Sequence, residues 1–177
     1  IVAEALEIEP GTSIKLKGIL HDQTGEGMAS DVFIVVEDGT GKIIEEIGKE
    51  TDEILEIPIA YNEPPSEWKV NLTSSGLLSE EIIKIKVKEE IKTELINDTL
   101  FLTNMGNVPY TRILLVKINN NTLNINASLP VGGVEAYVLT APDGEYNIRV
   151  SDGSSTSELG STFLTGRAIS LEGVSSI

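Results

Sequence analysis

The sequence predicts an all-β protein made of two antiparallel β-sandwich domains in tandem. Apolar and polar residues alternate with period two along most of the chain, and turn signals recur roughly every 8–12 residues. Charge also divides the chain, because residues 1–90 carry 8 basic and 20 acidic side chains and residues 91–177 carry 5 and 8. We therefore expect an acidic sandwich at 1–89 and a second sandwich at 90–177, with one large barrel as the alternative.

The first half offers strands wherever alternate residues are apolar, and these positions are 14–17, 31–37, 54–59, 68–73 and 83–88. The stretch 31–37 is apolar almost throughout, which is typical of a central strand, and residues 37–42 predict a hairpin turn. Residues 79–85 and 43–54 also show some helical spacing, although 43–54 fits an outer strand equally well. We expect helix content well below the usual third.

The second half repeats this pattern, with strands expected at 100–102, 114–118, 123–129, 134–140, 146–150, 163–165 and 168–171. Residues 104–107 and 119–121 predict turns. The tetrapeptide Ala141-Pro142-Asp143-Gly144 is the strongest hairpin signal in the chain. Trp68 alternates with Val70 and Leu72 in the first half, so we expect its indole in a core.

The second half resembles the immunoglobulin-like or fibronectin-III-like modules of prokaryotic surface proteins, above all the cell-adhesion-related (CARDB) type common in archaea. The resemblance is carried by LFLTNMGNVPY at 100–110, LPVGGV at 129–134 and APDGEYNIRV at 141–150. The first half is similar to bacterial immunoglobulin-like domains more generally, through Pro10-Gly11-Thr12 and the patterns at 18–32 and 65–70. The resemblance implies two immunoglobulin-like sandwiches and an extracellular, cell-surface location, and it implies no catalytic activity.

Composition excludes several functional classes. The absence of Cys excludes disulfide scaffolds and thiolate metal sites, and a single His excludes a multi-histidine site. A net charge of −15 argues against nucleic-acid and anionic-membrane partners. No apolar run approaches the roughly 20 residues of a membrane span. Because the chain begins with Ile1, we expect a mature chain or a fragment.

Four N-glycosylation sequons are the most informative local signals. Their asparagines are Asn71, Asn97, Asn120 and Asn126. Alternation places Asn71 and Asn126 on the outward faces of strands, and Asn97 and Asn120 fall in turns, so all four could accept a sugar without opening a core. The alternative is that polar residues simply occupy solvent faces and turns.

The remaining candidate sites are weaker. Asp22 and Glu26 are the first place to look for a calcium site, but the loop lacks the density of carboxylates in a dedicated calcium loop, and Asp-Gly pairs elsewhere are typical of turns. His21 is interpreted as structural or exposed. We predict no catalytic residue and no cofactor.

These observations favour a non-catalytic structural or adhesive module of an archaeal cell-surface protein, which contacts other chains or copies of itself. One alternative is a filament subunit, in which residues 1–8 or the tail 167–177 complete a neighbouring copy's sheet. Another is an accessory domain of a surface enzyme, which would bind carbohydrate if Tyr61, Trp68 and Tyr110 formed an exposed platform.

Overall fold

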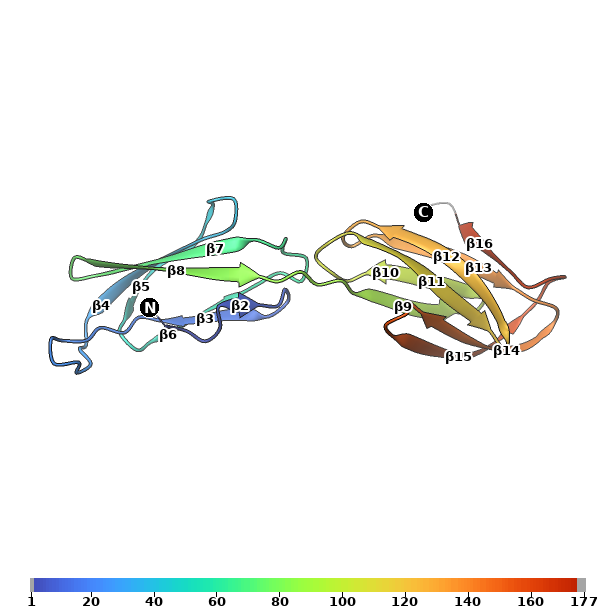
Figure 1. Cartoon of the computed structure of the whole chain (residues 1–177), viewed down its shortest axis with the longest axis horizontal. Coiled ribbons are helices and arrows are strands. Elements are labelled where there is room, and N and C mark those ends of the chain that lie inside the picture. The colour runs from blue at the N-terminus through green and yellow to red at the C-terminus, as the bar shows by residue number, and fades with distance from the viewer. Residues whose placement is uncertain (1, 175–177) are drawn as a thin grey trace. The chain divides into compact units, whose positions relative to one another are not determined.

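The computed structural model describes residues 2–174, and all regular structure within them is β-strand, which confirms the all-β prediction (Figure 1). The chain divides into two compact units, Ile1–Lys88 and Glu89–Ile177. We describe each unit separately as unit 1 and unit 2.

Unit 1 is a sandwich of a three-stranded and a five-stranded sheet. The first sheet has the order β1-β3-β6, with β1 (Val2–Ala3), β3 (Ser13–Lys17) and β6 (Ile54–Pro58). The second has the order β2-β8-β7-β4-β5, with β2 (Glu7–Ile8), β8 (Leu77–Ile85), β7 (Glu67–Ser74), β4 (Asp31–Glu37) and β5 (Ile43–Glu50). All paired strands are antiparallel except β2, which runs parallel to β8. The segments with helical spacing are therefore strands, since 79–85 lies in β8 and most of 43–54 in β5.

Unit 2 packs two four-stranded sheets together. One has the order β16-β13-β10-β9, with β16 (Ser170–Val174), β13 (Val134–Thr140), β10 (Thr99–Asn104) and β9 (Ile91–Ile96). The other has the order β12-β11-β14-β15, with β12 (Asn121–Leu129), β11 (Tyr110–Ile118), β14 (Gly144–Ser151) and β15 (Thr156–Leu164). Every pair in both sheets is antiparallel.

Each unit has its own apolar core between its two sheets. In unit 1 the inward side chains include Ile14, Leu16, Ile34, Val36, Trp68, Val70 and Ile83. In unit 2 they include Leu100, Leu102, Tyr110, Leu114, Val116, Ile148 and Leu164. The indole of Trp68 is 3% exposed, so the prediction of a core tryptophan is confirmed. Burial of alternate residues from facing sheets is the arrangement that stabilises a β-sandwich.

The two units share a connectivity. The pair β3–β6 and the run β8-β7-β4-β5 of unit 1 correspond in chain order to the pair β10–β13 and the run β15-β14-β11-β12 of unit 2. In unit 2 the Tyr146 hydroxyl, near the start of β14, donates a 2.9 Å hydrogen bond to the Pro142 carbonyl. A tyrosine that bonds back to the preceding corner in this way is a feature of immunoglobulin-like sandwiches.

The expected hairpin at Ala141–Gly144 is wrong. Strands β13 and β14 flank this tetrapeptide but belong to different sheets, because β13 pairs with β10 and β16 while β14 pairs with β11 and β15. The tetrapeptide therefore turns the chain from one sheet to the other. A turn sequence specifies a local reversal, and the core, through Tyr146 and its neighbours, decides where the next strand pairs.

Asn104, in the TNMGN segment at 103–107, has a structural role. Its side chain is fully buried, and its Nδ2 lies 2.9, 3.2 and 3.1 Å from the carbonyl oxygens of Val108, Leu129 and Pro130. Its Oδ1 accepts a 2.9 Å hydrogen bond from the Gly106 amide. One amide thus holds the β10–β11 connection against the end of β12, and every polar atom that it carries has a partner.

We expect Asn104→Ala to lower the free energy of unfolding by about 3 kcal/mol. The substitution leaves the buried Gly106 amide and the buried Leu129 carbonyl without this partner, and it also removes the contacts to the part-buried carbonyls of Val108 and Pro130. Urea unfolding of the full chain followed by circular dichroism measures the loss, and hydrogen exchange of peptides from β10 and β12 assigns it to unit 2. Asn124→Ala, at an exposed position of β12, is the matched control. Equal losses for the two variants would contradict this role.

Candidate functional site

All four sequon asparagines lie outside the cores, on the outer strand faces and in the turns where the sequence pattern placed them. Asn97 and Asn120 are exposed in the β9–β10 and β11–β12 turns, and Asn126 is exposed on β12. Asn71 is half-buried on the outer face of β7, between Val35 of β4 and Glu80 of β8. Asn97 also has a positive φ of 55°, a conformation that asparagine tolerates in a tight turn.

The loop with the calcium candidates is organised by its own hydrogen bonds. Asp22 Oδ1 accepts hydrogen bonds from the Thr24 hydroxyl (2.7 Å), the Thr24 amide (2.8 Å) and the Glu26 amide (2.9 Å). The bonds from Thr24, more than any other contact, hold the pKa of Asp22 below its usual range. Nδ1 of His21 lies 3.1 Å from the Gly25 carbonyl, an acceptor, which fits a structural role for this ring.

The same turn recurs in the β4–β5 connection. Asp38 Oδ1 accepts from the Thr40 hydroxyl (2.7 Å), the Thr40 amide (2.8 Å) and the Lys42 amide (3.1 Å). Both turns read Asp-x-Thr-Gly, so this short pattern is a turn motif of unit 1. Among residues 2–174, no group of three or more His, Asp or Glu side chains is placed to hold a metal ion.

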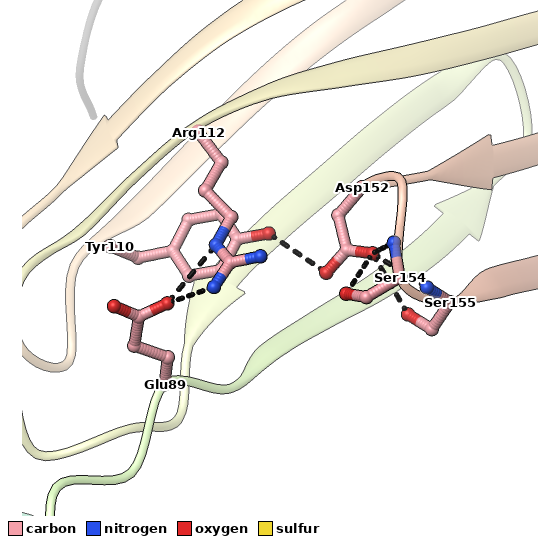
Figure 2. Close-up of polar contacts among 6 residues, drawn as sticks. All are labelled: Glu89, Tyr110, Arg112, Asp152, Ser154 and Ser155. Carbon is pink, nitrogen blue, oxygen red and sulfur yellow. Dashed lines mark hydrogen bonds and ion pairs between the residues drawn. The ribbon is translucent and has the colours of Figure 1, made fainter.

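A polar cluster of unit 2 joins three segments that are distant in sequence (Figure 2). Arg112, on β11, binds the Glu89 carboxylate through Nε at 3.0 Å and also through Nη2. This interaction raises the pKa of Arg112, and its guanidinium carbon lies 6.0 Å from the centre of the Tyr110 ring. The Glu90 carbonyl accepts a 2.9 Å bond from the Met105 amide, so the backbone just before β9 is held as well.

Asp152 forms the other half of this cluster. Its Oδ1 accepts hydrogen bonds from the amides of Ser154 (2.9 Å) and Ser155 (2.8 Å) and from the hydroxyls of the same residues. These bonds, led by that of the Ser155 backbone, lower the pKa of Asp152 to about 2. The Tyr110 hydroxyl points to Asp152 Oδ2 at 3.4 Å. Burial, and next the negative charge of Asp152, raise the pKa of Tyr110 to about 12.

The cluster borders a depression with a volume of about 230 Å³, but its charged groups are already engaged. Arg112 neutralises Glu89, and the β14–β15 turn occupies one oxygen of Asp152. Tyr110 is 2% exposed and keeps its proton at neutral pH. The arrangement therefore joins the start of unit 2, β11 and the β14–β15 turn, and we assign it a structural role.

Sequence reasoning missed this cluster and Asn104. Glu89 binds Arg112 although its side chain is still 43% exposed. The turn at Asp152-Gly153-Ser154-Ser155 carried a readable signal, since Asp followed by Ser at this spacing typically caps a turn. The other members come from separate strands, and no spacing in the sequence indicates that they meet.

The positions of the residues argue against both alternative functions that the sequence left open. Trp68 and Tyr110 are buried, so the platform of three exposed aromatics with Tyr61 does not form. Strand β1 pairs with β3, β2 pairs with β8, and β16 pairs with β13, so part of each proposed donor segment is paired within its own unit. Residues 1 and 175–177 of those segments lie outside the described residues. No helix within residues 2–174 is long and apolar enough to span a membrane.

Comparison of the chain with protein-family models and with curated proteins gave no match. The resemblance to cell-adhesion-related modules therefore stays a prediction that rests on the quoted motifs, and the fold itself stands on the strand order and cores described above.

We expect Asp152→Ala to lower the free energy of unfolding by about 1 kcal/mol at pH 7, a value that allows for solvent screening at this partly exposed group. Because the pKa is about 2 in the folded state against an ordinary 3.8, the unfolded chain binds the proton more readily. The contribution is thus complete above about pH 4 and disappears as the pH falls toward about 2.

Urea unfolding of wild type and Asp152→Ala at neutral and acid pH measures this difference. Asp143→Ala, at an exposed aspartate of the same unit, is the control. A stability difference between wild type and Asp152→Ala that stays constant from neutral to strongly acid pH would show that the carboxylate charge is not what stabilises the turn.

Proposed function

We propose that this chain is a non-catalytic structural or adhesive module of an archaeal cell-surface protein, exposed outside the cell and modified by N-linked glycans. The observation that carries the proposal is the placement of the four sequons. Each asparagine lies on an outer face or in a turn, while the cores are filled from the opposite side of the same strands. An attached sugar at any of these positions leaves the packing of either core unchanged.

The architecture supports this role in a second way. Each unit closes its core with its own sheets, and polar contacts at Asn104 and Asp152 hold the connections of unit 2 in place. Rigid sandwiches of this kind present loops, outer faces and sheet edges as contact surfaces. Partners would be other surface proteins or further copies of the chain.

Neither alternative gains a supporting observation. Filament assembly by donation of the terminal segments requires those segments to be free, and β1, β2 and β16 are paired within their own units. A carbohydrate-binding accessory domain requires exposed aromatic rings, and Trp68 and Tyr110 contribute to the cores instead. We therefore advance the structural or adhesive role alone.

We expect the full chain, secreted from an archaeal or eukaryotic host with N-glycosylation, to have an intact mass above the 19.0 kDa of the polypeptide. Peptide mass spectrometry then identifies which of the four asparagines carry sugar. A variant with all four asparagines changed to Gln, produced in the same host, is the control and should return to the polypeptide mass.

An unmodified wild-type chain, from a culture in which a reference glycoprotein is fully modified, would contradict the glycan-bearing part of the proposal. The structural role would then have to be supported by partner capture at the cell surface alone.

A further inference from the structure

Strand β12 is an unprotected edge of its sheet. It is the outermost strand of β12-β11-β14-β15 and pairs on one side only, with β11, along all nine residues from Asn121 to Leu129. Its sequence, NTLNINASL, holds no charged residue, no Pro and no Gly. A long, regular edge with free backbone groups is a template for pairing with a strand of another chain.

The other edges within residues 2–174 each carry a feature that opposes such pairing. The edge strands β1 and β2 have only two residues each, and β6 contains Glu56 and Pro58. Charged residues also lie in β5 (Lys49 and three glutamates, beside Gly48) and in β9 (Lys92 and Glu94). Strand β15 contains Glu158, Gly160 and an irregular register, and β16 contains Glu172 and Gly173. Charges, proline, irregularities and short length are the devices by which edge strands avoid association. Strand β12 alone among these edges has none of them.

What β12 has instead is a pair of sequons. Asn120 lies immediately before the strand, and Asn126 lies in its second half on the exposed face. Directly across the β11–β12 ladder from Asn126 is Ile113, which is 60% exposed. The outer positions next to Asn126 and Ile113, which include Thr111 and Ser128, are also uncharged. The charge on this face of the β11–β12 pair is Lys117, which lies across from Thr122 at the other end of the strand.

We propose that an N-linked glycan on Asn126 covers this edge and prevents β12 from pairing with a second copy of the chain. This inference rests on the glycan-bearing part of the proposed function. A strand added at the edge would place its own side chains about 5 Å from the Cβ of Asn126, in the space that a branched sugar occupies. The first sugar rings also lie within reach of Ile113, whose apolar surface they remove from water.

The test compares full-length chains secreted from one N-glycosylating host. Glycopeptide analysis should find sugar on Asn126, and the wild type should sediment as a monomer. Asn126→Gln should self-associate, with about a doubling of the weight-average mass as concentration rises, because a symmetric dimer is the simplest product of edge pairing. Ser128→Ala removes the same sequon without changing Asn126 and should behave in the same way.

Two further variants separate the edge from a general effect of sugar. Asn97→Gln removes a sequon from a turn of the other sheet and should stay monomeric. Asn126→Gln combined with Asn124→Lys places a charge on the exposed side of β12 and should restore the monomer, because an edge lysine opposes strand pairing. Circular dichroism spectra of all variants should match the wild type, which shows that each variant keeps the β fold.

The outcomes distinguish this inference from the proposed function. Sugar on other sequons but not on Asn126, a monomeric Asn126→Gln, equal association of Asn97→Gln, or failure of the added lysine to restore the monomer would each overturn the inference alone. Absence of sugar from all four asparagines would overturn the inference together with the glycan-bearing part of the proposed function.

Discussion

Both units depend on one constraint, which is that each paired sheet buries only one face. Alternate side chains of every core strand meet those of the facing sheet, and the core positions are occupied almost wholly by aliphatic and aromatic groups. Among the described residues only Ser74, Asn104 and Asn107 are buried polar side chains. Polar and modifiable residues are thereby confined to outer faces, turns and edges, and these are where any function of the chain must lie.

The same constraint explains why the strands were predictable and their partners were not. The run 31–37 became β4 with the expected bounds, and Trp68 entered the core, because a period of two is a local property of the sequence. Sheet membership is not local. The turn at Ala141–Gly144 was predicted as a hairpin, but pairing of β13 with β10 and of β14 with β11 sends the flanking strands to opposite sheets.

The candidate sites show the same difference between local features, which the sequence predicts, and contacts between distant segments, which it does not. The sequons could be placed correctly because alternation and turn residues decide whether an asparagine faces solvent. The turns at Asp22 and Asp38 share an organisation that composition does not show, because the loop's own amides and hydroxyls bind each carboxylate. The contact of Glu89 with Arg112 joins residues from separate segments, so only the folded chain brings it to view.

The two units differ in the charge of their surfaces. Unit 1 has a large negative charge and charged edge strands, and the repulsion between such surfaces weakens as salt shortens the Debye length to about 3 Å at 1 M. Unit 2 has a smaller net negative charge, with 10 acidic and 5 basic side chains, and the exposed row of β12 consists of Thr, Asn and Ser. Hydration of neutral amides and hydroxyls does not depend on screening. Contacts made by unit 1 should therefore vary with ionic strength, whereas those of the β12 face should be governed by what covers its edge.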